Sequence, residues 1–234
     1  SASTLEPTSK EFMEKLFSLK KNYNFKIIFD EVFTGFYKSE KMFCFQAFDE
    51  KIPDVLCLSK TLGGGKSSIS SLIIDDDTYK SAYSKINETF LHTTTYNGFG
   101  EESVTALAAL DIISEKNFEK RVLEISKLLK SKLNNLKEKH PNKIEKIKGN
   151  GLLNGIIFSS YISEIGNLIE NIPLQVINDK SSFLKKITAT AISAELYEKY
   201  NILTAINDSK FSDHLCVSPS LIISDENIEY FFKS

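Results

Sequence analysis

Two segments decide the fold: KIIFDEVFTGF at residues 26–36 and PDVLCLSKTLGGGK at residues 53–66. Each contains a short run of aliphatic or aromatic residues that ends in loop-forming residues, a pattern typical of buried parallel strands. The first run ends in the carboxylate of Asp30, and the second is followed closely by Lys60. Because ligands of open α/β sheets bind beyond the carboxyl ends of the strands, we expect this acid and this lysine to meet over one ligand.

The glycine-rich segment has a competing interpretation as a nucleotide-triphosphate site. A phosphate-binding loop requires the pattern G-x-x-x-x-G-K-[ST] and opens a helix. Counting back from Gly65-Lys66-Ser67 places Lys60 where the first glycine is required. The residues that follow, SISSLIID at 68–75, predict a strand. The pattern therefore disfavours a nucleotide-triphosphate site.

The other interpretation is a pyridoxal-phosphate site. This cofactor requires a lysine for its aldehyde and a carboxylate for its pyridinium nitrogen. Lys60 and Asp30 are residues of these two types at the ends of two predicted strands. As single residues they would also suit a solvated surface lysine and an aspartate that caps a turn, so the pair alone leaves structural roles open.

Four ordered segments resemble the class III, or omega-type, aminotransferases of fold type I: DEVFTGF (30–36), LSKTLGGG (58–65), HTTTYNGFG (92–100) and GNGLLNG (149–155). The resemblance implies pyridoxal 5'-phosphate as cofactor, with Lys60 as its Schiff-base lysine and proton carrier and Asp30 as the partner of the ring nitrogen. It also implies that Val32 packs on the cofactor ring. Thr95 would bind the cofactor phosphate of the neighbouring subunit in a homodimer.

The sequence departs from the family pattern at three sites. Phe33 stands where many members carry glutamine, and Gly98-Phe99-Gly100 stands where they usually carry Gly-Asn-Pro. Cys216 occupies the place of an arginine that anchors the carboxylate of α-amino acid substrates. Arg121 is the single arginine of the sequence, and lysine is a poorer partner for a carboxylate. We expect a substrate without that carboxylate, an anchor such as Lys210, or an arginine outside this chain.

The composition excludes several classes of function. A formal net charge of −2 provides no field that favours nucleic acid or an anionic membrane. Cys44, Cys57 and Cys216 lack disulfide or zinc spacing, which predicts reduced thiols in a cytoplasmic protein without a metal site. The sequence contains no signal peptide and no long apolar segment, so we expect no membrane association.

The resemblance and the hydrophobic patterns together predict an α/β fold with two parts. Residues 1–115 would form the C-terminal part of the cofactor-binding large domain of fold type I, and residues 116–234 a small α+β C-terminal domain. A helix is predicted from Pro7 to Tyr23, with an apolar face that contains Phe12, Leu16, Leu19 and Tyr23. A second is predicted over 101–115, with an apolar face that contains Val104, Leu107, Ala108 and Ile112.

Local signals also predict elements of the C-terminal part. The glycines at 149 and 151 predict a hairpin. A helix is predicted from Thr188 to Tyr200, and a last one from Ser224, its N-cap, to Phe232.

The sequence thus predicts a pyridoxal-phosphate-dependent aminotransferase, which moves an amino group between an amine or amino acid and a keto acid or aldehyde. Ser1 aligns with the middle of a family member, so we expect a fragment that lacks the N-terminal half. It would associate with that half or form a homodimer. An aminomutase or decarboxylase on the same fold and a non-catalytic dimerisation fragment are alternatives, because the cofactor residues would look the same.

Overall fold

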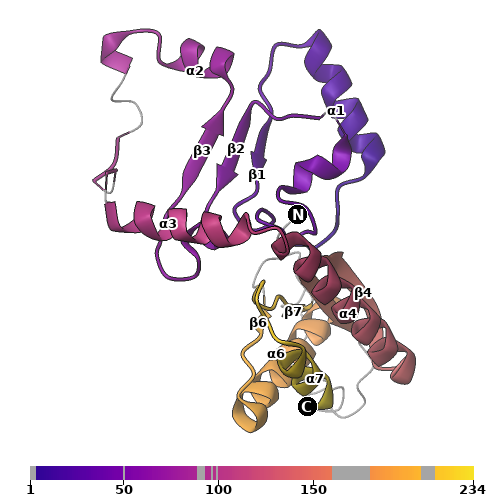
Figure 1. The fold of residues 1–234 in the computed structure, drawn as a ribbon. Helices are drawn as coiled ribbons and strands as arrows, with labels where there is room; N and C mark the ends of the chain where they lie inside the picture. Colours follow the sequence, from indigo (N-terminus) through magenta and orange to yellow (C-terminus); the bar gives the residue numbers. More distant parts are fainter. Residues whose placement is uncertain are drawn as a thin grey trace. The chain divides into compact units, whose positions relative to one another are not determined.

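The computed structural model describes residues 4–49, 51–88, 93–95, 97–98, 100–159, 180–206 and 214–234 (Figure 1). The chain divides into two compact units. The N-terminal unit comprises Thr8–Lys120, and the C-terminal unit comprises Arg121–Ser234 together with the segment that ends at Pro7. Each unit contains a sheet and helices, so the fold is mixed α/β, as predicted.

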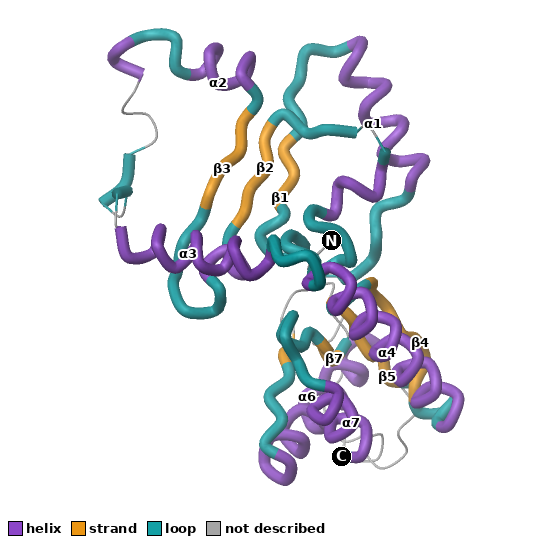
Figure 2. The backbone as a smooth tube through the Cα atoms, viewed as in Figure 1, coloured by secondary structure: helices purple, strands orange, loops and turns teal. Residues whose placement is uncertain are grey.

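The N-terminal unit is built on a three-stranded sheet in the order β1-β2-β3 (Figure 2). β1 (Ile28–Asp30) and β2 (Val55–Leu58) are parallel, which confirms the prediction from the two apolar runs. β3 (Ser71–Ile74) is antiparallel to β2. The chain therefore enters a strand after the glycines, not a helix, which contradicts the phosphate-loop interpretation.

Helices connect and cover these strands. Those of the described residues are α1 (Lys10–Asn22), α2 (Asp76–Ala82), α3 (Gly100–Ile113) and three 3₁₀ helices, η1 (Cys44–Phe48), η2 (Lys60–Gly63) and η3 (Ile86–Glu88). Side-chain caps fix the starts of α1 and α2. Ser9 Oγ accepts a hydrogen bond from the N–H of Phe12, and Asp75 accepts one from the N–H of Thr78. These caps satisfy backbone donors that the first helical turn leaves without a partner.

The apolar face predicted for α1 is partly wrong. Met13 is its buried residue, whereas Phe12 and Tyr23 are 57% and 63% exposed. The ring of Phe17 meets the ring of Phe29 on β1, with centroids 6.3 Å apart. Apolar residues lie on two adjoining stripes of this helix, so the position of the sheet decides which stripe is buried.

The face predicted for α3 is also wrong. Its buried residues are Ala106, Ala109 and Ile113, whereas Val104 and Leu107 are 67% and 62% exposed. The helix is apolar on both sides, so the pattern could not select one. The alanine side allows close approach: a Cβ added to Gly64 would lie 3.2 Å from the Cβ of Ala109. Small side chains thus bring α3 against the turn that follows β2.

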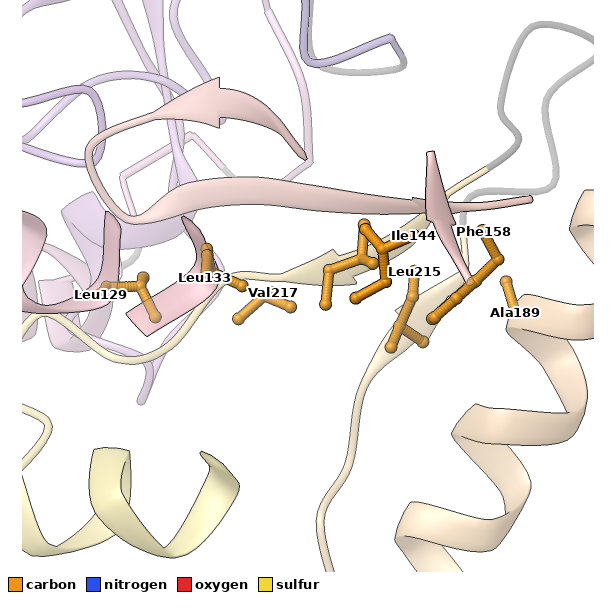
Figure 3. Packing of buried hydrophobic residues seen from close by; sticks show 8 residues of the cluster. Leu129, Leu133, Ile144, Phe158, Ala189, Leu215 and Val217 are labelled. Carbon is orange, nitrogen blue, oxygen red and sulfur yellow. The ribbon is translucent and has the colours of Figure 1, made fainter. Parts of the chain in front are cut away.

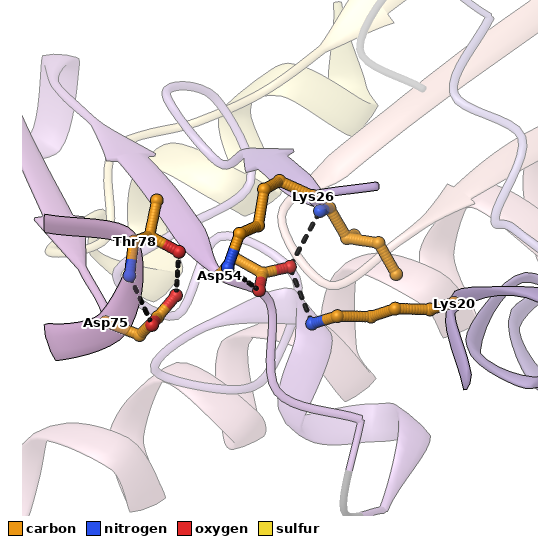
Figure 4. Close-up of polar contacts among 6 residues, drawn as sticks. Lys20, Lys26, Asp54, Asp75 and Thr78 are labelled. Atoms are coloured by element: carbon orange, nitrogen blue, oxygen red, sulfur yellow. Dashed lines mark hydrogen bonds and ion pairs between the residues drawn. The ribbon is translucent and has the colours of Figure 1, made fainter. Parts of the chain in front are cut away.

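Asp54 joins α1 to the start of the parallel strands (Figure 4). Its side chain is 7% exposed and accepts hydrogen bonds from Lys20 Nζ at 2.6 Å and from the N–H of Ile27 at 2.7 Å. Lys26 Nζ lies 3.5 Å from the second carboxylate oxygen. Burial alone would raise the pKa of Asp54. The Lys20 and Ile27 hydrogen bonds and the two lysine charges together outweigh burial and hold the pKa below its ordinary value.

We expect Asp54→Asn to lower the free energy of unfolding at neutral pH by about 1–3 kcal/mol, because a buried carboxylate with charged donors is replaced by an amide. The folded pKa of Asp54 is lowered, so the unfolded chain takes up the proton first as the pH falls. The contribution of Asp54 is therefore complete above about pH 4 and is lost below it. Denaturant titrations at neutral pH and at about pH 3 should show the deficit of the variant shrinking in acid.

Asp49→Asn is the matched control for this prediction. Asp49 also pairs with a lysine, Lys10, at 3.3 Å, but its side chain is 79% exposed. Exposed ion pairs contribute little to stability, so this variant should unfold nearly as the wild type does. Equal losses in the two variants would contradict the structural role assigned to Asp54.

The C-terminal unit contains a four-stranded antiparallel sheet in the order β4-β5-β7-β6. Its elements are β4 (Ile144–Asn150), β5 (Leu153–Phe158), β6 (Ala205–Ile206), β7 (Leu215–Val217), α4 (Phe118–Lys139), α6 (Lys180–Tyr200) and α7 (Asp225–Lys233). The hairpin predicted around residues 149–151 is confirmed. Gly149 has a φ of 99°, and an added Cβ would overlap the carbonyl oxygen of Leu153. Glycine is therefore required at this position.

A buried apolar cluster joins the sheet of this unit to its helices (Figure 3). Leu129 and Leu133 of α4 and Ala189 of α6 belong to the same buried cluster as Leu215 and Val217 of β7. α7 begins after Ser224, which caps it as predicted. α6 begins at Lys180, earlier than the predicted Thr188. No helix among the described residues is long and apolar enough to span a membrane.

Candidate functional site

Asp30 and Lys60 lie at the same edge of the N-terminal sheet. Asp30 is the last residue of β1, and Lys60 follows the end of β2 by two positions. The two strands are parallel neighbours, with Asp30 in register with Cys57. Both side chains are exposed. The structure therefore brings the predicted acid and lysine to adjoining strand ends.

The backbone at Lys60 adopts an uncommon conformation. Its φ is 44°, in the left-handed region that few residues other than glycine enter. The preceding residue is held by a hydrogen bond from Ser59 Oγ to the carbonyl oxygen of Ile69, at 2.7 Å. Gly64, with a φ of 60°, ends the turn. Strained residues are maintained only where the surrounding structure fixes them, and such sites cluster where function requires them.

The turn that carries Lys60 packs against α3. Leu62 is buried in the core cluster that also contains Ala106 and Ile113 of α3. Gly64 lies close to Ala109 of the same helix. One end of η2 thus rests on packed apolar residues while the Lys60 side chain projects to the surface.

The environment of the acid–lysine pair suits a ligand that carries both a positive and a polar group. Asp30 Oδ1 accepts a hydrogen bond from the N–H of Val32 at 3.0 Å, and Lys60 Nζ lies 5.7 Å from the centre of the Phe33 ring. The ion pairs found among the described residues include neither Asp30 nor Lys60. A pyridinium N–H and an aldehyde are groups that these two side chains can bind, so the residues present fit pyridoxal phosphate.

Glu31 is a buried acid to which the sequence assigned no role. It is 3% exposed, and its carboxylate accepts hydrogen bonds from the N–H groups of Cys44 and Phe45. Burial raises the pKa of Glu31, although these hydrogen bonds and a contact with Thr34 partly offset the effect. The sequence shows two adjacent acids, Asp30 and Glu31, after the first apolar run, but this pattern does not indicate which of the two is buried.

Of the other predicted site residues, Val32 contacts this pair through its backbone N–H, which donates a hydrogen bond to Asp30. Val32 is half-buried. Thr95 is exposed in the turn before α3, where Thr94 Oγ1 donates a hydrogen bond to Asn97 Oδ1 at 3.0 Å. In the described part of the chain, no contact joins Thr95 to Asp30 or Lys60. Lys210 lies outside the described residues.

Cys216 occupies the middle of the C-terminal sheet. It is buried on β7, in register with Gly155 on one side and Ala205 on the other. These are small residues on one face of three adjacent strands. Arg121 lies in the same unit and donates a hydrogen bond to Asp225 at 2.8 Å. The single arginine of the sequence is thus engaged with a carboxylate of α7. None of the described residues form a cluster that could hold a metal ion.

Comparison with known proteins places these features in one family. The family model described as aminotransferase class-III matches residues 2–234. The chain is 30% identical to acetylornithine aminotransferase of Clostridium acetobutylicum over 202 residues, which are 82% of this chain and 48% of that protein. It is 36% identical to adenosylmethionine-8-amino-7-oxononanoate aminotransferase of Helicobacter pylori over 123 residues, 52% of this chain and 27% of that protein.

The structural comparison agrees. A transaminase from the marine bacterium Virgibacillus matches with a TM-score of 0.77 and 20% sequence identity, over 96% of this chain and 47% of that one. The likeness shows the fold, which is that of the fold-type-I pyridoxal-phosphate-dependent transferases. The chain spans about half of the length of this transaminase and of the Clostridium protein, and about a quarter of the Helicobacter protein. With the family model matched over residues 2–234, the chain belongs to the class III aminotransferases.

Proposed function

We propose that the protein is a pyridoxal-phosphate-dependent aminotransferase that moves an amino group between an amine or amino acid and a keto acid or aldehyde. One observation carries the proposal: in a chain of the class III family, Asp30 ends one of two parallel, adjacent strands and Lys60 follows the end of the other by two positions. Class III aminotransferases depend on pyridoxal phosphate. When bound, this cofactor supplies an electron-accepting ring that stabilises negative charge on the substrate carbon.

Each proposed site residue has a distinct task. Lys60 Nζ would hold the cofactor through its aldehyde, and the Asp30 carboxylate would accept a hydrogen bond from its ring nitrogen. The Lys60 amine, when free, would act as the general base and acid that holds and moves the proton of the substrate carbon. Val32 would pack on the cofactor ring. The Thr95 hydroxyl would bind the cofactor phosphate of a second subunit.

The assembly and the domain roles belong to the same proposal. Residues 1–115 are the C-terminal part of the cofactor-binding domain, and residues 116–234 are the small domain. The exposed apolar side chains of α3, Val104, Leu107 and Ile112, support a further polypeptide on that helix. That polypeptide is the N-terminal half of the enzyme or a second copy in a homodimer. A cytoplasmic location, inferred from cysteines without disulfide or zinc spacing, stays a prediction.

A half-reaction assay tests this function. The protein that contains this chain is loaded with pyridoxal phosphate, and amino donors are added without an acceptor. We expect the absorbance of the aldehyde form to disappear, the aminated cofactor to accumulate, and one equivalent of keto acid or aldehyde to be released. Release of carbon dioxide would identify a decarboxylase, and an isomerised amine a mutase. Failure to bind the cofactor would identify a non-catalytic fragment.

We predict a substrate preference from Cys216 and Arg121. A carboxylate is bound best by the planar donor fork of arginine. Cys216 cannot supply one, and Arg121 is paired with Asp225. We therefore expect poor turnover of α-amino acids such as ornithine through the α-carboxylate. Diamines, or acids whose carboxylate lies far from the reacting carbon, should react faster. The measurement is kcat/KM over a panel of such donors.

Cys216→Arg should raise kcat/KM for α-amino acids by on the order of tenfold or more, which is the effect of one charged hydrogen-bonding pair. Cys216→Leu is the matched control, because it adds volume at the same buried position without charge. Wild-type preference for short α-amino acids, unchanged by the added arginine, would show that the anchor lies elsewhere.

A further inference from the structure

Glu31 holds together three segments around the acid–lysine pair. Its carboxylate accepts hydrogen bonds from the N–H groups of Phe45, at 2.8 Å, and Cys44, at 2.5 Å. These two residues open η1, and the first N–H groups of a helix have no partner within it. The Glu31 carboxylate therefore caps η1, although it precedes the first residue of that helix by 13 positions. A Glu31 side chain that is 3% exposed makes this cap inaccessible to water.

The backbone of Glu31 adds two further contacts. Its N–H donates to the carbonyl oxygen of Cys57 on β2, and its carbonyl oxygen accepts a hydrogen bond from the N–H of Gly35, both at 3.0 Å. A Cβ added to Gly35 would lie 2.9 Å from that same carbonyl oxygen, so the turn is tight. Glu31 thus fixes both ends of the segment 32–43, which we call the Glu31 loop.

The Glu31 loop has its own internal support. The N–H of Phe36 donates to the carbonyl oxygen of Met42, and the N–H of Tyr37 donates to that of Lys41. Phe36 is 2% exposed and belongs to the core of the N-terminal unit. The Glu31 loop therefore has an ordered conformation of its own, and its position depends on the contacts that Glu31 makes with its two ends.

This loop carries the ring that meets the lysine. Phe33 lies two residues after Glu31, and Lys60 Nζ is 5.7 Å from the centre of its ring. An ammonium over an aromatic face is stabilised by the negative potential of the ring, and the ring also covers one side of the amine. Whatever holds Phe33 in place therefore influences how the Lys60 amine reacts.

We propose that Glu31 is a positioning residue, whose buried carboxylate holds the Glu31 loop so that the ring of Phe33 lies on the amine of Lys60. The inference rests on the proposed function only in giving Lys60 its catalytic role, because the contacts belong to the chain itself. If Glu31 had only a structural role, it would stabilise the fold without affecting the reactivity of the Lys60 amine. The reactivity of Lys60 distinguishes these two roles.

The experiment is a double-mutant cycle on the cofactor-free protein, with Glu31→Gln, Phe33→Leu and the two combined. Each protein is reductively methylated with limiting formaldehyde at one pH, and peptide mass spectrometry gives the rate at Lys60 relative to Lys66. Lys66 is exposed and serves as an internal reference. Phe33→Leu should raise the ratio roughly two- to fivefold, the effect of one exposed cation–π contact. Glu31→Gln should raise it similarly, and the double variant should add nothing further.

Glu14→Gln is the control, because it makes the same chemical change on an exposed part of α1 and should leave the ratio unchanged. If Glu31→Gln fails to fold by circular dichroism, Gly35→Ala displaces the same loop with the carboxylate intact and replaces it in the cycle. The positioning role would be overturned if the effects of Glu31→Gln and Phe33→Leu on the labelling ratio are additive. It would also be overturned if Glu31→Gln leaves the ratio of Lys60 to Lys66 labelling unchanged. If the effects of the two substitutions on Lys60 labelling are coupled but the wild type does not transaminate, the positioning role of Glu31 is supported and the proposed function is refuted. If the wild type transaminates but the two effects are not coupled, the proposed function is supported and the positioning role is refuted.

Discussion

Replacing Lys60 with alanine should abolish covalent attachment of pyridoxal phosphate. Borohydride reduction should fix one cofactor to the wild-type chain, on the peptide that contains Lys60, and none to the variant. The fold should survive, because the Lys60 side chain is exposed and its described contact is with a single ring. Alanine also suffers no more strain than lysine at a φ of 44°. Intact-mass spectrometry after reduction measures the attachment, and circular dichroism measures the fold.

Lys66→Ala is the control, since Lys66 follows the same glycines and is exposed. It should retain the full cofactor mass after reduction. A cofactor that remains fixed to the Lys60→Ala chain would assign the attachment to another lysine. The strand-end argument for Lys60 would then fail.

Asp30→Asn should retain the cofactor but lose turnover by several powers of ten. The neutral amide of asparagine could not hold a proton on the ring nitrogen of a bound cofactor, which would then stabilise negative charge on the substrate carbon poorly. Each 1.4 kcal/mol or so of lost transition-state stabilisation reduces the rate tenfold. The local fold should persist, because asparagine Oδ1 can still accept the hydrogen bond that Val32 donates to Asp30. Single-turnover kinetics with a good amino donor measures the chemical step.

The matched control for this second prediction is Asp111→Asn, an exposed aspartate of α3. It should turn over at the wild-type rate. Near-normal turnover by Asp30→Asn, with cofactor bound, would show that Asp30 does not serve the ring nitrogen.

Local patterns in the sequence predicted much of the secondary structure. The parallel pairing of β1 and β2 followed from two short apolar runs that end in loop residues. The cap of α7 by Ser224 and the hairpin of β4 and β5 followed from residues that act over a few positions. Such features depend on neighbouring backbone groups, so local sequence is sufficient to predict them.

Local sequence patterns did not predict which faces of α1 and α3 are buried. α3 carries apolar residues all round, and α1 carries two adjoining stripes, so periodicity permitted more than one orientation. Packing selected Ala106 and Ala109 on α3, because their small side chains allow close approach to the turn after Lys60. The larger Val104 and Leu107 remain on the outside of this chain.

The sequence by itself determined the family and the two residues at the strand ends. Asp30 and Lys60 are recognisable because Asp30 directly follows one apolar run and Lys60 follows another by two positions, and because the spacing of four motifs is specific. Only the tertiary structure decided the environment of that pair. Glu31 reaches η1, Asp54 reaches α1, and Phe33 meets Lys60 through contacts between residues far apart in the chain. Burial and long-range hydrogen bonds depend on how distant segments pack, and a local pattern does not contain that information.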